Sequence, residues 1–308
     1  MKQDSLLIIA PPTLRPDPLF PAFEHRFCTL NGHRLHYVVG GEEGAPTILL
    51  LTGFPQSWFA WRHVMAHLSA KFRVIALDLP GQGDSDRPSA GYDTLTVAGE
   101  VKAFLNHIEV PCCSVVAHDI GAWVAFSLAA SDPETVERLV LLDAGIPGVT
   151  LPDTLPVAAD RAWRTWHFAF HVVDDLPEAL ITGRERVYLE WFLRRKTANP
   201  QTFSDHDIDE YVRVFAKDGG LRAGLAFYRD VGRSASQNRE LVAQARLPMP
   251  VLAVGADQGS IADMAGPLRM FADNVTGYTI SNCGHFIPEE QPEALADVLR
   301  SFLGEAHL

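Results

Sequence analysis

Short apolar runs alternate with helix-like segments along this chain. Five of these runs are apolar at successive positions, so both faces of a strand would be buried; they cover residues 47–51, 73–78, 114–118, 138–144 and 250–256. Helical periodicity marks other stretches, at about 93–109, 120–131, 260–272 and 290–303. Strands that are apolar on both faces and separated by helices are typical of a parallel sheet covered by helices. The pattern therefore predicts an α/β fold with a mostly parallel sheet flanked by helices.

Two regions depart from this alternation. Ahead of the parallel series, Asn31-Gly32 stands between two strand-like runs and predicts a tight β-hairpin. Between residues 147 and 247 the chain is rich in Trp, Phe, Arg and Asp, with helical patterns and no strand-like runs of Val and Ile. We therefore expect a core in two parts, residues 1–146 and 248–308, and a helical cap, residues 147–247, inserted after one strand of the sheet.

Composition and charge narrow the class of protein. The chain has 308 residues, of which 47% are hydrophobic, and a formal net charge of −12. This acidic balance argues against nucleic acid as a partner, because binding a phosphate backbone needs concentrated Lys and Arg. No run approaches the roughly 18 apolar residues of a membrane span. The apolar run at residues 5–10 is too short for a secretory signal, so we expect a cytoplasmic protein; the sequence leaves open whether it is a monomer or a homodimer.

No motif in the sequence indicates a metal ion or a cofactor. The four cysteines form no CxxC pair and are expected to be small core residues; they lie at positions 28, 112, 113 and 283. His63 and His67 are four positions apart but lack the glutamate of a zinc-protease motif. The acidic stretch 205–210 lacks the glycine of a calcium loop. We therefore expect neither a metal ion nor a cofactor.

An aspartate stands where many hydrolases carry a nucleophilic serine. Asp119 lies between a strand-like run and the helix that begins at Ile120, with the small residues Ala117 and Gly121 two positions to either side. A nucleophile on such a sharp strand-to-helix turn is typical of the α/β-hydrolase fold. The alternative is that Asp119 only caps the helix that follows it.

A histidine and a second carboxylate complete a candidate triad. His285 lies in a loop between the last strand-like stretch and the C-terminal helix, where the catalytic base of this fold is found. Asp143 and Asp257 each follow a core strand, and either could orient the histidine. We favour Asp143, because the acid of the second pattern would stand three positions after Gly255, where this chain has Gln258.

Two backbone N–H groups are expected to form an oxyanion hole beside Asp119. One belongs to Ile120, the residue after the nucleophile, and the other to Phe54, in the loop TGFPQSW. Phe168 is a candidate wall of the substrate pocket. Trp58 is a second candidate, with packing in the core as the favoured alternative.

A carboxylate nucleophile suits a different substrate from serine. It is poor toward esters and amides, because the resulting anhydride reverts, but it can attack a saturated carbon that bears a leaving group. Water activated by His285 would then hydrolyse the alkyl ester. The leaving group would be a halide or an epoxide oxygen, and an epoxide oxygen needs a hydrogen-bond donor opposite the nucleophile. His167 and Tyr228 of the cap are the candidate donors, with aromatic packing as the alternative, while Ile120 stands where dehalogenases commonly carry Trp or Arg.

Taken together, these motifs resemble the Cif family of bacterial epoxide hydrolases. The resemblance covers the chain from the predicted hairpin onward and is carried by VAHDIG, TGFPQSW, IALDLPGQG, WHFAF, FYRDV and GHFIPEE. It implies an α/β-hydrolase with a helical cap that converts small-molecule epoxides to vicinal diols without a cofactor. By this resemblance, Asp119 is the nucleophile, His285 the general base and Asp143 the charge-relay acid. The pairing of His167 with Tyr228 is the more specific sign, since most other epoxide hydrolases use two tyrosines.

Two departures from the family pattern accompany the resemblance. Thr52 stands where the family has a histidine in the oxyanion motif, and Cys283 lacks the second cysteine of a disulfide expected in a secreted relative. The missing disulfide again favours a reducing compartment. A haloalkane or haloacid dehalogenase with the same nucleophile, and a non-catalytic binding protein on this fold, remain the alternatives.

Overall fold

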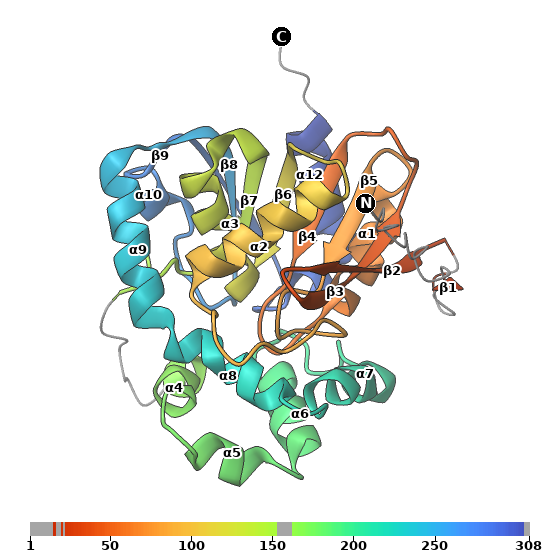
Figure 1. Ribbon diagram of the computed structural model, residues 1–308, viewed down its shortest axis with the longest axis vertical. Coiled ribbons are helices and arrows are strands. Elements are labelled where there is room, and N and C mark those ends of the chain that lie inside the picture. The colour runs from red at the N-terminus through yellow and green to blue at the C-terminus, as the bar shows by residue number, and fades with distance from the viewer. Residues whose placement is uncertain (1–14, 17–19, 21, 153–161, 305–308) are drawn as a thin grey trace, which may run out of the picture.

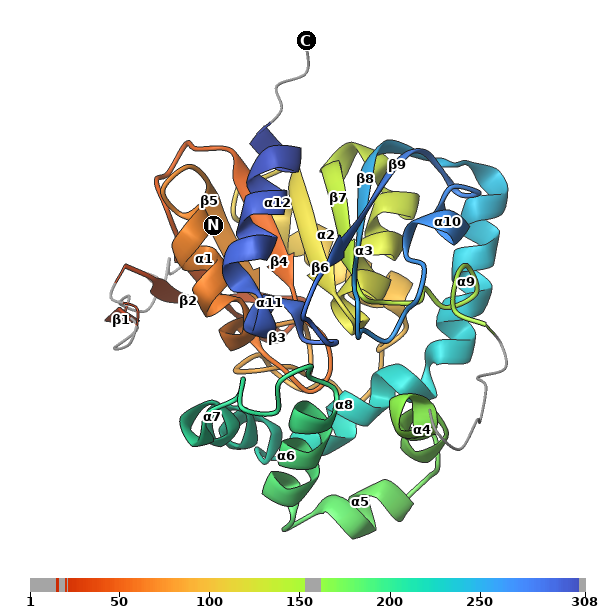
Figure 2. The ribbon, with the colours of Figure 1, turned by 180° about the vertical axis from the view of Figure 1, so that it is seen from behind.

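A nine-stranded sheet lies between two layers of helices in the computed structural model, which describes residues 15–16, 20, 22–152 and 162–304 (Figures 1 and 2). The order of its strands is β1-β2-β3-β5-β4-β6-β7-β8-β9. Their bounds are β1 Arg15–Pro16, β2 Glu24–Leu30, β3 His33–Gly40, β4 Thr47–Leu51, β5 Arg73–Leu77, β6 Cys113–His118, β7 Val136–Leu142, β8 Leu247–Ala256 and β9 Ala272–Ile280. The first three strands and the β3–β5 pair are antiparallel, and every pair from β5 to β9 is parallel.

The predicted mostly parallel sheet is therefore confirmed. Each of the five apolar runs forms one of its parallel strands, and β6 is buried along its whole length, as a strand covered on both faces should be. The hairpin also forms where it was predicted. Leu30 pairs with His33, and Asn31 and Gly32 between them both have positive φ, 51° and 83°, as a tight hairpin turn requires.

Helices cover both faces of the sheet (Figures 1 and 2). One layer contains α2 (Thr94–His107), α3 (Ile120–Ser131) and α9 (Val231–Gln244), and the other contains α1 (Arg62–Leu68), α11 (Ile287–Glu290) and α12 (Pro292–Gly304). Short helical turns lie at Trp58–Trp61, Pro133–Thr135 and α10, Ala265–Leu268. Within the described part of the chain, no helix is long and apolar enough to cross a membrane.

A group of helices lies beyond the carboxyl ends of the parallel strands, at the bottom of Figure 1. Its members are α4 Ala162–His171, α5 Leu176–Ile181, α6 Glu185–Arg195, α7 Asp205–Phe215 and α8 Gly220–Arg229. We call these helices the cap. The cap therefore faces the sheet edge at which Asp119 and Asp143 lie. The domain boundaries at 147 and 247 stay a prediction, and the N-terminal run at 5–10 lies outside the described residues.

Two expectations from the sequence are wrong. The segment 260–272 is not one helix: it contains only the single turn α10, and β9 begins at Ala272. Its first residues form a loop, in which the N–H groups of Ser260 and Ile261 bind the Asp143 side chain. Cys112 is exposed, whereas the other three cysteines are buried as expected.

Candidate active site

Asp119 lies on the sharp turn between β6 and α3, with φ 53° and ψ −124°. A positive φ is strained for a residue other than glycine and is often found at functional sites. A small neighbour makes the turn possible, since a Cβ atom added to Gly121 would lie 2.6 Å from the carbonyl oxygen of Leu51. The Asp119 side chain makes no capping bond to α3. It faces other partners instead.

The loop after β4 brings a backbone donor to the Asp119 carboxylate. The Phe54 N–H donates to Asp119 Oδ2 at 2.9 Å. Gly53 allows this approach, because a Cβ atom there would lie 2.4 Å from Asp119 Oδ2 and 2.5 Å from Ile120 N. The N–H groups of Phe54 and Ile120 are thus gathered at one point beside the carboxylate.

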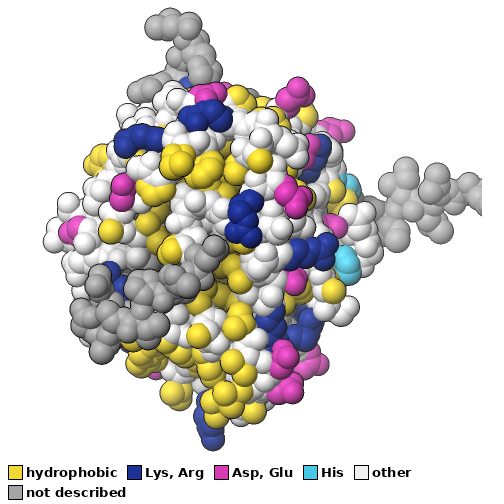
Figure 3. All heavy atoms as spheres, turned by 90° about the vertical axis from the view of Figure 1, so that its left-hand side faces the viewer, with side chains coloured by type: hydrophobic (Ala, Val, Ile, Leu, Met, Phe, Trp, Pro, Cys, Tyr) yellow, Lys and Arg dark blue, Asp and Glu magenta, His cyan; other side chains and the backbone are white. Residues whose placement is uncertain are grey.

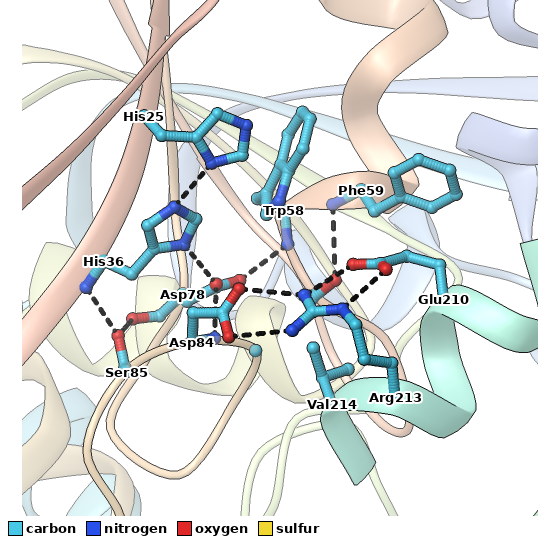
Figure 4. Close-up of polar contacts among 12 residues, drawn as sticks. His25, His36, Trp58, Phe59, Asp78, Asp84, Ser85, Glu210, Arg213 and Val214 are labelled. Atoms are coloured by element: carbon cyan, nitrogen blue, oxygen red, sulfur yellow. Dashed lines mark hydrogen bonds and ion pairs between the residues drawn. The ribbon is translucent and has the colours of Figure 1, made fainter. Parts of the chain in front are cut away.

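Hydrogen bonds from neighbouring buried residues, and not the Thr52 side chain, hold the loop after β4 in place. The Thr52 hydroxyl finds no hydrogen-bond partner among the described residues, and Gln82 Nε2 donates to the Thr52 carbonyl oxygen at 3.2 Å. Asp78, just after β5, accepts hydrogen bonds from Trp58 N–H at 2.7 Å and from His36 Nδ1 at 2.6 Å (Figure 4). Sequence reasoning missed this network because Asp78 and His36 are far apart in the sequence and no local motif links them.

The structure brings His285 and Asp143 together. His285 Nδ1 donates to Asp143 Oδ2 at 2.7 Å, and the N–H groups of Ser260 and Ile261 donate to the same carboxylate at 2.7 and 3.0 Å. Burial alone would raise the pKa of Asp143, but these three donors hold it below its ordinary value. The other ring nitrogen, His285 Nε2, lies 3.8 Å from Asp119 Oδ1. The ring is therefore oriented toward the nucleophile without a hydrogen bond to it.

Asp257 lies apart from this pair. Its carboxylate accepts hydrogen bonds from the N–H groups of Asn282 and Cys283 at 2.9 and 3.0 Å. These backbone donors lower the pKa of Asp257, which is exposed to solvent. Asp257 thus holds the start of the loop that carries His285, while Asp143 holds the imidazole itself.

Two buried cap side chains, Tyr228 and His167, lie next to each other, and Tyr228 is within electrostatic reach of Asp119. Tyr228 on α8 and His167 on α4 are both 2% exposed, and their rings lie 5.6 Å apart. Burial and the nearby charge of Asp119 raise the pKa of Tyr228 well above its ordinary value. Burial and the charge of Lys196 lower the pKa of His167 well below its ordinary value. At neutral pH both side chains are uncharged, so each offers a hydrogen-bond donor in an apolar setting.

The structure treats the two pocket candidates differently. Phe168 joins the cap cluster, with its ring 5.3 Å from Tyr228 and 6.1 Å from Trp123. Trp58 is placed elsewhere, with its ring 4.9 Å from that of His25 in the N-terminal hairpin (Figure 4). Phe168 thus lies beside the candidate donor Tyr228, and its role as a pocket wall stays a prediction, whereas Trp58 packs as the favoured alternative describes.

Sequence reasoning missed a hydrogen-bonded pair in the cap, His171 and Tyr188. His171 Nε2 and the Tyr188 hydroxyl are 2.5 Å apart, and the His171 ring lies 4.4 Å from that of Tyr228. A signal for His171 was present, because it follows His167 by four positions and so shares its helix face. Tyr188 carried none, since it reaches this cluster from a different helix.

An apolar groove of about 670 Å³ opens on the outside of the cap. Tyr188 and Trp166 form part of its lining, together with the exposed side chains of Val187 and Trp191. Figure 3 shows hydrophobic side chains gathered on the surface at the cap end of the molecule. Further hydrophobic side chains are exposed on the cap surface in and around α5, namely Val172, Val173, Leu176 and Leu180. Tyr188 thus belongs both to this groove and to the inner cluster around Tyr228.

Lys196, which ends α6, is a further residue that the sequence did not indicate. Its side chain is buried, with Nζ 4.5 Å from the centroid of the Phe192 ring. Its carbonyl oxygen accepts a hydrogen bond from His285 N–H at 2.8 Å. The run of basic residues before it is typical of a solvated helix end, so nothing local distinguished it. Within the described ranges, no three His, Cys, Asp or Glu side chains are grouped to hold a metal ion.

Comparison with known proteins places this geometry in context. A family model for the alpha/beta hydrolase fold matches residues 46–292. The chain is 38% identical over 282 residues to a soluble epoxide hydrolase from Corynebacterium, which covers 90% of this chain and 96% of that protein. Identity to epoxide hydrolase 4 of Mus musculus is 26%, covering 89% of this chain and 77% of that protein.

Solved structures show the same likeness. Cfl2 from Burkholderia cenocepacia superposes with a TM-score of 0.93 and 62% identity, covering 94% of this chain and 99% of that one. The epoxide hydrolase CorEH superposes with a TM-score of 0.84 and 35% identity, covering 92% of this chain and 99% of that one.

Proposed function

The chain belongs to the alpha/beta hydrolase fold family, and we propose that it hydrolyses epoxides to vicinal diols through an alkyl ester on Asp119. Epoxide hydrolase activity follows from the similarity to epoxide hydrolases over most of the chain. One observation supports the mechanism above all others. A carboxylate occupies the elbow, with backbone donors and a His285–Asp143 pair beside it and two uncharged donors, His167 and Tyr228, in the cap.

The first half of the reaction opens the ring. An oxygen of Asp119 attacks a ring carbon, the bond between that carbon and the epoxide oxygen breaks, and an ester forms. His167 and Tyr228 donate hydrogen bonds to the oxygen as charge develops on it, and the resulting alkoxide takes the Tyr228 proton. A positioned general acid of this kind contributes roughly a hundredfold to ten-thousandfold in rate. Its apolar surroundings strengthen each of these hydrogen bonds.

The second half releases the diol. His285, held by Asp143, takes a proton from water, and the hydroxide attacks the carbonyl carbon of the Asp119 ester. The Phe54 and Ile120 N–H groups stabilise the negative charge that forms on the carbonyl oxygen. Collapse of this intermediate breaks the ester, and the departing oxygen takes the proton from His285. The Asp119 carboxyl keeps the oxygen of the water, and its remaining proton returns to Tyr228.

The finer assignments belong to the same proposal. The pairing of His167 with Tyr228 supports a Cif-type enzyme within the epoxide hydrolases. Ile120 beside the nucleophile supports epoxide over halide chemistry, because it offers no side-chain donor to a halide or a carboxylate. A cytoplasmic location and the choice between a monomer and a homodimer remain predictions from the sequence.

Intact-mass measurement of the His285→Gln protein tests this proposal. Without its base the enzyme should open the ring but not hydrolyse the ester, so a small panel of epoxides should leave an adduct of one whole epoxide mapped to Asp119. His67→Gln is the matched control, because His67 is exposed on α1. It should turn over epoxides and carry no adduct.

Two results would overturn the proposal. A mass gain equal to a haloalkane minus its halide, with none from epoxides, would identify a dehalogenase. Absence of any adduct, together with no epoxide turnover by the wild-type protein, would favour a binding protein on this fold.

A further inference from the structure

The proposed reaction leaves one charged side chain near the site without a role. Phe54 and Ile120 hold the oxyanion, and His167 and Tyr228 hold the epoxide oxygen. Lys196 has no part in either half of the reaction. Yet it is a buried cation in the same region, and its backbone carbonyl oxygen accepts a hydrogen bond from the backbone N–H of His285.

The Lys196 ammonium is buried without an anionic partner of its own. Its residue is 7% exposed, and among the described residues no side chain forms a hydrogen bond or an ion pair with Nζ. The contact it does make is with the face of the Phe192 ring, at 4.5 Å. A cation on an aromatic face is stabilised by about 1–2 kcal/mol, which is less than the several kcal/mol that burying an ammonium costs.

Charges around Lys196 come from the core and from the cap. Burial lowers the pKa of Lys196 to about 8, while the carboxylates of Asp119 and Asp143 act in the opposite direction. On the cap side, its charge lowers the pKa of both His167 and His171. The ammonium is therefore within electrostatic reach of the nucleophile and of the epoxide-oxygen donor.

The two core carboxylates do not serve as its partners. Asp143 already accepts hydrogen bonds from His285, Ser260 and Ile261. Asp119 accepts one from Phe54 and loses its charge when the ester forms. Once that happens, the cation has still less to balance it. An anion that arrives with the substrate would supply the missing partner.

We propose that Lys196 binds a carboxylate carried by the substrate, so that this enzyme prefers epoxides with a carboxylate attached close to the ring. This inference rests on the proposed function. The carboxylate must be near the ring because Lys196 is bonded to His285 through its backbone and contacts Phe192, whose ring lies 5.1 Å from that of His167. Lys196 is thus linked to the backbone of the base, and its ammonium lies on a ring that contacts the oxygen donor, so a short spacer suffices.

A pair of small substrates of nearly equal shape tests this inference. Oxirane-2-carboxylate and oxirane-2-carboxamide differ in charge but hardly in size, so the ratio of their kcat/KM values isolates the recognition of charge. A hydrogen bond between charged groups predicts a ratio of about tenfold or more in favour of the carboxylate. Lys196→Met, which keeps the apolar stem, should bring the ratio to about one with little change for the carboxamide. Lys71→Met, at an exposed lysine, should leave both values unchanged.

The wild-type enzyme provides a second test that needs no variant. Because kcat/KM reports the ionisation of the free enzyme, the preference for the carboxylate should fall as the pH rises through the Lys196 pKa of about 8. Any ionisation that affects both substrates alike cancels in the ratio.

Three results would overturn the inference. The first is a wild-type ratio near one, and the second is a ratio that Lys196→Met does not change. The third is an equal loss with both substrates, which would give Lys196 a part in the chemistry or in the fold. If neither substrate is turned over and His285→Gln forms no adduct with either, the proposed function fails first and the inference falls with it.

Discussion

Asp119 and Asp143 are aspartates at the carboxyl ends of two neighbouring strands, and both have a positive φ, 53° and 38°. Their surroundings give them different chemistry. Asp143 is 1% exposed, and its oxygens accept three hydrogen bonds, one of them from His285. Its carboxylate is therefore fully occupied in orienting the histidine. Asp119 is less buried and accepts one hydrogen bond, from Phe54, which leaves Oδ1 able to approach a substrate.

Replacing each candidate acid by asparagine separates their roles. Asp143→Asn should reduce kcat by about ten-thousandfold, because an amide neither fixes the His285 tautomer nor stabilises the imidazolium. Ester hydrolysis needs the base and ring opening does not, so this variant should accumulate the Asp119 adduct in an intact-mass measurement. Asp257→Asn is the matched control and should retain turnover close to wild type. Greater loss in Asp257→Asn than in Asp143→Asn would contradict the assignment.

The residues of the site differ in how far the sequence could predict them. Asp119 and Asp143 each follow a strand that its apolar run reveals, and His285 lies between the last strand-like stretch and the C-terminal helix, so their meeting at one sheet edge could be expected. Lys196 and Tyr188 could not be expected, because they depend on how cap helices pack over the core, and no periodicity within a helix encodes that packing.

At the scale of elements, the site depends on how closely the loop after β4 approaches the start of α3. Gly53 is the point of contact, since a Cβ atom there would lie 2.4 Å from Asp119 Oδ2 and 2.5 Å from Ile120 N. Neither neighbour can move easily, because one is the nucleophile and the other is backbone. This contact therefore limits what residue 53 can be.

Gly53→Ala should lower kcat by about a hundredfold, the loss expected when catalytic groups are displaced by roughly 1 Å. Gly99→Ala is the matched control, because Gly99 lies on α2 with no atom within 4 Å of an added Cβ. It should keep full activity and gain about 0.5–1 kcal/mol of stability, as alanine does in a helix. Steady-state kinetics and urea unfolding of both variants check this. Full activity of Gly53→Ala would show that the loop can retreat without losing the oxyanion hole.

Helices and strands could be predicted where their burial requires a long run of apolar residues. The central strands are apolar on both faces, and α3 is buried along Ile120 to Ala129, so both gave long apolar signals. The segment 260–272 misled because its first turn has helix-like composition, yet the backbone there serves Asp143.

At the scale of the whole molecule, the cap is tied to the core by two arginines that reach in opposite directions. Arg62 of α1, in the core, bonds Asp207 of α7 at 2.8 Å and Glu289 at 2.7 Å. Arg213 of α7 bonds Asp84 in the core loop at 2.9 Å (Figure 4). Arg62 is buried, whereas the Arg213 side chain is 44% exposed. Buried and exposed ion pairs contribute differently to the free energy of unfolding. Replacing Arg62 and Arg213 in turn compares the two kinds directly.

Arg62→Met should destabilise the protein by about 3–5 kcal/mol at pH 8, because it leaves Glu289 buried as an unpaired charge. Burial raises the pKa of Glu289 from 4.5 to about 7 even with Arg62 present. Between pH 7 and 4.5, Glu289 is therefore protonated to a greater extent in the folded protein than in the unfolded chain. Arg62 lowers this pKa, so the pKa of Glu289 is higher still in Arg62→Met. The cost of the missing cation is therefore full only above that higher pKa, shrinks as the pH falls from there, and is smallest below about pH 7.

Urea unfolding at pH 8 and pH 5.5 measures this pH dependence. Arg213→Met serves as the control and should cost about 1 kcal/mol or less, since exposed ion pairs are screened by water. Because α11, which carries Glu289, follows His285 directly, the same measurement bears on the site. Loss of Arg62 should reduce kcat less at pH 5.5 than at pH 8 relative to wild type. At the lower pH Glu289 is neutral, so less unpaired charge is buried beside α7 of the cap. An equal destabilisation at both pH values would contradict this prediction, because it would mean that Glu289 stays charged throughout.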